Sequence, residues 1–365
     1  MNVADRNQRI TEYLEDFFDK AEKDAFSALD SETNAQLDAV FGTTVRGYRE
    51  ILLVIVIARL LNPEYKASQG FYDCNPRALY EGPIRHELLS RGIPHGKSGP
   101  LNVAKATIGI NMQWAAQRRP AAVAKDVVSL VGKIESFDSN ALNNFAVALQ
   151  KRFLDEAQRI ENLTVETSPE ADPYFLSTLA TQLISSVPDS GNTPQKIIGF
   201  LLQAYHDDLQ SGLVVTGHED GASVTNTTSQ KPGDLTEELL DGTVVKIYEI
   251  TVKPFTQNRI VESYQSVKAY DKRTSQTTHE VQVICRKEDL PEDVSNNTEA
   301  FYLGKVEYQD ITYHFINIEE WIMAQLLRMS GEARLIFHKL LTDYIADTNT
   351  SESVKVFWKE LHATA

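Results

Sequence analysis

The feature that most restricts the fold of this chain is a change in hydrophobic periodicity near residue 212. Before it, apolar residues recur every three or four positions, as in 36–61, and this spacing predicts amphipathic helices. After it, β-branched and aromatic runs alternate with helical ones, and 243–253 (TVVKIYEITVK) gives the strongest strand signal. We therefore expect an α+β or α/β protein, with a helical region at 1–211 and a mixed β-sheet core flanked by helices at 212–365.

The second region should alternate strands with helices and should contain one long loop. The predicted strands are 212–216, 243–253, 279–285, 300–307 and 311–316, and the predicted helices are 258–270, 317–346 and 351–361. The segment 217–235 is rich in Gly, Ser, Thr and Asn and predicts a loop. In the first region, a helix that begins at Pro76 should bend at Pro83, because proline interrupts helical hydrogen bonding.

Length and composition favour a soluble protein of two domains. The chain has 365 residues, more than one hydrophobic core usually organises. Its longest apolar run, 51–61, is shorter than the ~20 residues that cross a bilayer, and predicts a buried helix. No signal peptide is recognisable, and two cysteines, Cys74 and Cys285, are too few for a disulfide framework or a zinc site. We expect a cytoplasmic protein without a membrane span.

Charge is distributed unevenly along the chain. The formal net charge is −15, yet residues 75–125 hold eight Lys or Arg and two Glu, a local charge of +6. Such a window is either a solvated face or a surface for a polyanion such as double-stranded DNA. The residues predicted to contact DNA are Arg77, Arg85, Arg91, Lys97, Ser98, Lys105, Arg118 and Arg119.

The chemistry-bearing residues lie around the strongest predicted strand. Side chains alternate along a strand, so Glu249, Thr251 and Lys253 should share one face. Asp234 lies fifteen residues before Glu249, in a predicted turn, and neighbouring strand ends can bring both carboxylates together. Two carboxylates form a hard-oxygen site that suits Mg²⁺, with Asp234 and Glu249 as the metal ligands.

This arrangement resembles the PD-(D/E)XK nuclease superfamily. Asp234 after a proline matches the first acid, Glu249 the second and Lys253 the lysine; the strand–helix–strand order at 243–285 matches the core. The helical first region with its Gly-rich basic turn is similar to type II restriction endonucleases of SacI-like layout. The resemblance implies a Mg²⁺-dependent endonuclease that hydrolyses double-stranded DNA at a short sequence as a homodimer.

One departure leaves the catalytic lysine open. The family places its acid and lysine two residues apart, whereas Glu249 lies four before Lys253, with Thr251 between them. Lys231 is the alternative lysine, and Thr251 and His218 are possible accessory groups. The pair His206-Asp207 resembles an HD metal motif, but without its partner residues it predicts only the end of an amphipathic helix.

Two other functions remain open at this point. A nuclease of the same superfamily could act in repair or defence on other nucleic acid. A non-catalytic DNA-binding or scaffold protein could retain the fold alone; its DNA affinity would fall steeply with salt, without cleavage.

Overall fold

The computed structural model describes residues 2–221, 230–294 and 299–363. It is a mixed α+β structure that divides into two compact units, Met1–Asn162 and Leu163–Ala365. This boundary differs from the predicted one at 211/212. The reason is that α10 (Pro173–Ser186) and α11 (Asn192–Leu209) share a hydrophobic core with the strands that follow them.

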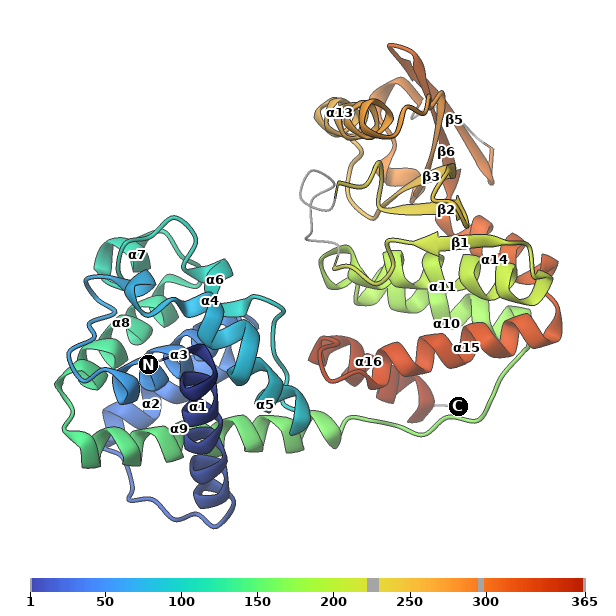
Figure 1. The fold of residues 1–365 in the computed structure, drawn as a ribbon. Coiled ribbons are helices and arrows are strands. Elements are labelled where there is room, and N and C mark those ends of the chain that lie inside the picture. Colours follow the sequence, from blue (N-terminus) through green and yellow to red (C-terminus); the bar gives the residue numbers. More distant parts are fainter. Residues whose placement is uncertain (1, 222–229, 295–298, 364–365) are drawn as a thin grey trace. The chain divides into compact units, whose positions relative to one another are not determined.

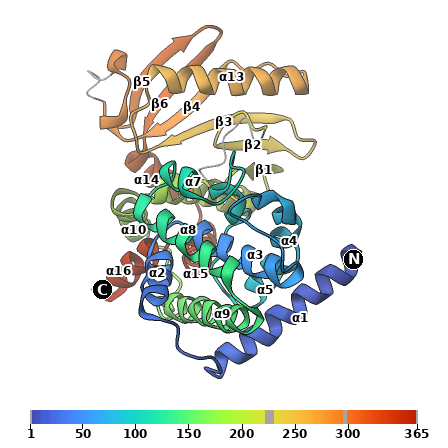
Figure 2. The ribbon, with the colours of Figure 1, turned by 90° about the vertical axis from the view of Figure 1, so that its left-hand side faces the viewer.

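The first unit is built from helices. They are α1 (Val3–Glu22), α2 (Ser31–Gly42), α3 (Gly47–Leu61), α4 (Pro76–Leu79), α5 (Arg85–Ser90), α6 (Gly99–Val103), α7 (Met112–Ala116), α8 (Ala121–Ser136) and α9 (Ser139–Glu161). Helix α3 packs against α6 and also against α8 and α9, which are labelled beside it in Figure 2. It contains the apolar run, and every residue from Gly47 to Arg59 is buried, as a helix at the centre of a core requires. Among the described residues, no helix has the length and apolar character that crossing a membrane requires.

The predicted bend at Pro83 is present. Between α4 and α5 the chain forms a π-helical turn, Tyr80–Ile84, in which Gly82 leaves helical geometry. Proline supplies no amide hydrogen, so a regular helix cannot continue through this position.

The second unit contains a six-stranded mixed sheet in the order β1-β2-β3-β4-β6-β5. The strands are β1 (Leu213–Thr216), β2 (Leu235–Leu239), β3 (Val244–Thr251), β4 (Glu280–Cys285), β5 (Tyr302–Tyr308) and β6 (Ile311–Asn317). Strands β1, β2 and β3 form an antiparallel meander, β3, β4 and β6 run parallel, and β5 closes the sheet as an antiparallel partner of β6. Helix α13 (Gln257–Thr274) connects β3 to β4.

The two faces of the sheet have separate cores. Helix α13 covers one face (Figure 1), where Ile260 and Val267 pack on strand residues such as Ile247 and Val283. The other face packs against α11 and α14 (Ile318–Arg328), and its core continues into α10, α15 (Gly331–Ala346) and α16 (Glu352–Ala363). Strand β3 is therefore covered on both sides, and Ile247–Thr251 are all buried.

Two sequence predictions need correction in this unit. Strand β2 starts where the predicted loop 217–235 ends, and it had no prediction of its own. The predicted long helix 317–346 is two helices, α14 and α15, because Ser330 caps a new helix by accepting a hydrogen bond from the Ala333 amide.

Candidate active site

The β2–β3 hairpin brings the two predicted metal ligands together. Leu235 pairs with Tyr248 in the antiparallel register, so the preceding residue, Asp234, lies opposite Glu249. Residues directly opposite in an antiparallel pair point to the same face of the sheet. The fifteen-residue separation in sequence is thus the length of the hairpin.

Hydrogen bonds hold both carboxyl groups in place. The Asp234 amide donates to the Tyr248 carbonyl (2.9 Å), and Asp234 Oδ2 accepts from the Ile250 amide (2.8 Å). Glu249 Oε1 accepts from the hydroxyl of Ser263 in α13 (2.8 Å). The two carboxyl groups also lie within hydrogen-bonding reach of each other. Glu249 is buried and Asp234 is half-buried, so the pair lies between the protein interior and solvent.

Asp234 and Glu249 are two acids close together, and their surroundings raise the pKa values of both. Burial, and then the charge of Asp234, raise the pKa of Glu249. Burial also raises the pKa of Asp234, although the hydrogen bond from Ile250 and the charge of Arg259 act in the opposite direction. Carboxylates this close disfavour double ionisation, and a cation bound between them would remove that penalty.

Arg259, which the sequence analysis did not identify, is the basic residue next to the pair. It lies in the first turn of α13, and its guanidinium hydrogen-bonds Thr251 Oγ1 and packs over the Phe255 ring, 4.8 Å from the centroid. Its positive charge acts on both Asp234 and Glu249. A signal was present in the sequence: Arg259 and Ser263 are four residues apart and therefore share one face of the predicted helix.

The structure places Lys253 differently from the prediction. Strand β3 ends at Thr251, so side-chain alternation does not extend to residue 253. The Lys253 amide donates to Thr251 Oγ1 (3.0 Å), and its carbonyl accepts from the same hydroxyl (2.7 Å), while its side chain is exposed. Of the predicted polar face, Glu249 and Thr251 both reach α13, through Ser263 and Arg259 respectively.

Lys231, the alternative lysine, and His218, a possible accessory group, each lie beside an acid other than Asp234 and Glu249. The Lys231 ammonium pairs with Asp220 (2.8 Å). His218 is buried, packs edge-on against Phe200, and lies 3.8 Å from Glu219; burial lowers its pKa. The rest of this predicted loop, 222–229, lies outside the described residues.

Several of the predicted DNA-contacting residues are held by the protein itself. Arg91 pairs with Glu87 (2.6 Å) and Glu22 (3.0 Å) and stacks over the Phe18 ring. In the π-helical turn before α5, the Glu81 carboxylate accepts a hydrogen bond from the Ser98 hydroxyl (2.7 Å) and lies 3.4 Å from the Arg77 guanidinium. These ion pairs and hydrogen bonds reduce the charge available to a polyanion.

Of the other residues predicted to contact DNA, two arginines bind backbone carbonyls and two lysines are exposed. Arg118 donates to the carbonyls of Val103 (2.6 Å) and Lys105 (2.8 Å), and Arg119 donates to the Arg118 carbonyl. Lys97 and Lys105 have exposed side chains, and Arg85 is half-buried. Within this window, Lys97 and Lys105 are the clearest surface for phosphate contacts.

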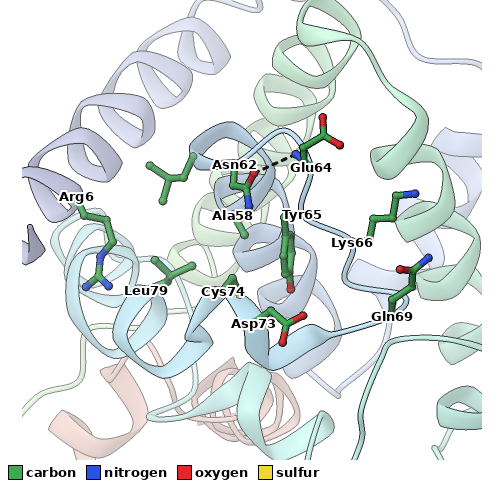
Figure 3. A pocket seen from close by; sticks show the side chains of 11 residues that line it. Arg6, Ala58, Asn62, Glu64, Tyr65, Lys66, Gln69, Asp73, Cys74 and Leu79 are labelled. Atoms are coloured by element: carbon green, nitrogen blue, oxygen red, sulfur yellow. Dashed lines mark hydrogen bonds between the residues drawn. The ribbon is translucent and has the colours of Figure 1, made fainter. Parts of the chain in front are cut away.

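The helical unit also contains a hollow of about 430 Å³ between α1, α3 and the segment that follows α3 (Figure 3). Its basic residues, Arg6 and Lys66, are matched by Glu64 and Asp73. A balanced charge of this kind gives no attraction for a polyanion.

The described residues contain no group of three or more His, Cys, Asp or Glu side chains arranged to hold a metal ion. Asp234 and Glu249 form a smaller set of two, which is within the usual number of carboxylates for Mg²⁺. No protein-family model matches the chain, and no curated protein shows significant similarity to it.

Proposed function

We propose that the second unit is a Mg²⁺-dependent endonuclease of the restriction type that cuts double-stranded DNA at a short sequence. The observation that carries this proposal is the meeting of the Asp234 and Glu249 carboxyl groups, from two adjacent strands, beside the positive charge of Arg259. Strand β3, helix α13 and the parallel strand β4 follow the strand–helix–strand order that the PD-(D/E)XK resemblance implies.

Asp234 and Glu249 suit a small divalent cation. Burial raises the pKa values of both groups, so they hold protons more tightly than free carboxyl groups, and a bound metal ion would compete with those protons. Bound Mg²⁺ supplies a water of lowered pKa and offsets negative charge on the scissile phosphate. Ser263 keeps the Glu249 carboxyl oriented, and the Ile250 amide does the same for Asp234.

Arg259 provides the fixed positive charge that the family pattern assigns to lysine. Its guanidinium is oriented by Thr251, so Thr251 acts as a positioning residue. A cation fixed beside a phosphodiester stabilises the charge that develops in the transition state. Lys253 lies two residues beyond Thr251 and is the competing candidate for this role.

The test is DNA cleavage by purified protein with Mg²⁺, using Asp234→Asn and Glu249→Gln beside the wild type. Each variant should lose about a hundredfold or more of the cleavage rate. Glu262→Gln, an exposed acid on α13, is the matched control and should cut normally. Discrete fragments indicate a sequence-specific enzyme, and a smear indicates a less specific nuclease. Equal cutting by wild type and Asp234→Asn, or no cutting across varied DNA and RNA, rejects the proposal.

The same proposal assigns phosphate contacts to the exposed lysines of the first unit. Lys97→Ala and Lys105→Ala should each reduce the slope of log affinity against log salt by about 1. Arg118→Ala should instead weaken the packing of the 103–105 segment, because its guanidinium binds two carbonyls there. Salt-dependent binding without any cleavage would favour the non-catalytic alternative.

The proposal includes a homodimer and a cytoplasmic location. A two-fold assembly is the simplest way to cut both strands of a symmetric site. Sedimentation of the protein on a short cognate duplex measures the number of chains bound.

A further inference from the structure

The second unit holds a cavity on the side of the sheet away from α13. It has a volume of about 530 Å³ and lies between α11, α14 and strands β1, β2, β3, β4 and β6. This volume is in the range of pockets that enclose small organic ligands. The residues of the carboxylate pair do not line it, so it is a separate site.

The walls of the cavity are apolar and partly aromatic. Leu202, Leu213 and Ile316 provide aliphatic surface, and Tyr205 and Trp321 are aromatic lining residues. Flat aromatic surface of this kind favours a planar ring, because rings stack and displace poorly bonded water.

Buried polar groups also line the cavity, and one of them has no partner in the described part of the chain. The Gln325 side chain is 3% exposed, and its Nε2 makes no hydrogen bond there. An unsatisfied buried donor is costly, so such a group calls for an explanation. A ligand that presents a hydrogen-bond acceptor to Gln325 provides one. The Gln282 amide lines the same space.

Glu237 is the acid of this cavity, and its charge is compensated. One oxygen, Oε1, accepts from the Tyr248 hydroxyl (2.7 Å) and lies 3.3 Å from His206 Nε2. The other, Oε2, lies 3.9 Å from the Lys246 ammonium. Glu237 and Gln325 both line the cavity, so a ligand could donate to the one and accept from the other.

Two cations complete the site. The Lys246 side chain is half exposed, and the Arg328 guanidinium lies 3.9 Å from the Tyr205 ring centroid with its side chain exposed. Both line the cavity and reach solvent, which places positive charge at its mouth. Guanidinium and ammonium groups are the usual protein partners of phosphate.

We propose that this cavity binds a nucleotide, with the base between the apolar walls and the phosphate at Arg328 and Lys246. The base supplies a planar ring with hydrogen-bond donors and acceptors on its edge. A donor of the base can pair with the Glu237 carboxylate, and an acceptor of the base can pair with the Gln325 amide. A glutamine amide is a recognised reader of a base edge. The nucleotide is either a free mononucleotide or one rotated out of a nucleic acid strand.

The first test is calorimetric titration of the full chain, in EDTA, with the four common nucleoside monophosphates and the matching nucleosides. At least one monophosphate should bind more tightly than its nucleoside. Gln325→Leu should weaken both about 5-fold, the usual value of one hydrogen bond. Arg328→Met should remove most of the preference for the monophosphate and change nucleoside binding little. Gln265→Leu, an exposed glutamine on α13, is the control and should bind normally.

A second test separates the two sources of the nucleotide. A duplex or single strand containing 2-aminopurine brightens when that base leaves the stack. Brightening that needs about 5-fold more protein in Gln325→Leu, and that Asp234→Asn leaves unchanged, indicates a rotated base; binding of free nucleotides alone indicates a mononucleotide site. Because EDTA is present, neither result depends on cleavage. Absence of binding to every nucleotide and oligonucleotide at millimolar concentration, or binding that neither Gln325→Leu nor Arg328→Met changes, overturns the proposal.

Discussion

The β2–β3 hairpin buries acidic side chains on both faces of the sheet, and the two faces treat them in opposite ways. Facing α13, burial raises the pKa values of both Asp234 and Glu249, and the charge of Asp234 raises that of Glu249 further. Facing α11, burial raises the pKa of Glu237, but His206, Tyr248 and Lys246 lower it more, so it falls below its ordinary value.

The difference teaches that burial alone does not determine what a carboxyl group does. Glu237 is matched by its own protein neighbours and stabilises the fold as an anion. Asp234 and Glu249 are matched mainly by each other, with Arg259 as the nearby positive charge. A buried acidic pair with a deficit of positive charge is a candidate functional site for a cation.

The largest expected effect is on catalysis, and it concerns Arg259. Replacing Arg259 by Met removes the fixed charge beside the carboxylates and should reduce cleavage several hundredfold, up to about a thousandfold. Arg259→Lys keeps a charge without the planar contact to Thr251 and should recover part of the rate. Rates are measured on plasmid DNA at saturating Mg²⁺.

The matched control for this prediction is Lys253→Met. If Arg259 is the operative cation, this variant should keep its rate within about threefold, the range of many surface changes. A loss at Lys253 equal to that at Arg259, or a loss at Lys253 alone, would return the role to the lysine that the family pattern favours. Circular dichroism of each variant shows whether the fold is retained.

The sequence predicted the part of the site that depends on local pattern. Strand β3 was expected from its β-branched residues, and the pairing of Asp234 with Glu249 from their spacing. Strand β2 was missed because Glu237 and Glu238 have low strand propensity; pairing on both sides and the neighbours of Glu237 hold them in the sheet. Arg259 was missed because its contact with the site depends on how α13 packs across the sheet.

The fold of the second unit was predicted less well at its start. The strands from β3 to β6 were found within a few residues, whereas α10 and α11 were assigned to the helical region. Periodicity identifies a helix but not the core it joins, and the membership of Leu201 and Ile250 in one core is a tertiary property. The same limit explains why the use of Arg91 and Arg118 within the first unit was not foreseen.

The next largest effect is on the free energy of unfolding. Replacing the buried glutamate on one face of the hairpin should change it in the opposite direction from replacing the one on the other face. At pH 8 in EDTA, Glu237→Gln should cost about 2 kcal/mol, because the ionised form with its lowered pKa is the one that its neighbours stabilise. Glu249→Gln should be neutral or stabilising by about 1 kcal/mol, because it removes a charge that burial and Asp234 oppose. Urea unfolding measures both.

The pH dependence of these variants sharpens the contrast. The folded-state pKa of Glu237 is lowered, so its contribution is present above the unfolded-state pKa and disappears as pH falls through the folded-state value. Glu237→Gln and wild type should therefore converge in acid. Glu262→Gln, exposed to solvent, should remain within about 0.5 kcal/mol of wild type throughout. The same sign for both buried glutamates would contradict the comparison.

The smallest expected effect is the pH dependence of stability in the helical unit. The buried acid there is Glu50 of α3, next to the Gly-rich turn at 93–100. Its Oε1 accepts from the Gly96 amide (2.6 Å), and a side chain at Gly99 would displace the Glu50 carboxyl group. Burial raises the pKa of Glu50 to about 7, against the hydrogen bonds from Gly96 and Tyr80.

Glu50 should therefore behave like Glu249 and not like Glu237. A carboxyl group whose folded-state pKa is raised favours the folded state most when it is neutral, so stability should fall as pH rises from about 5 to 8. The loss should be on the order of 1 to 2 kcal/mol, and Glu50→Gln should remove it while keeping an acceptor for Gly96. Hydrogen exchange of α3 amides at both pH values reports this unit separately from the sheet. An unchanged pH dependence in Glu50→Gln would mean that Glu50 stays ionised in the folded state, stabilised by the charges of Arg49 and Arg46.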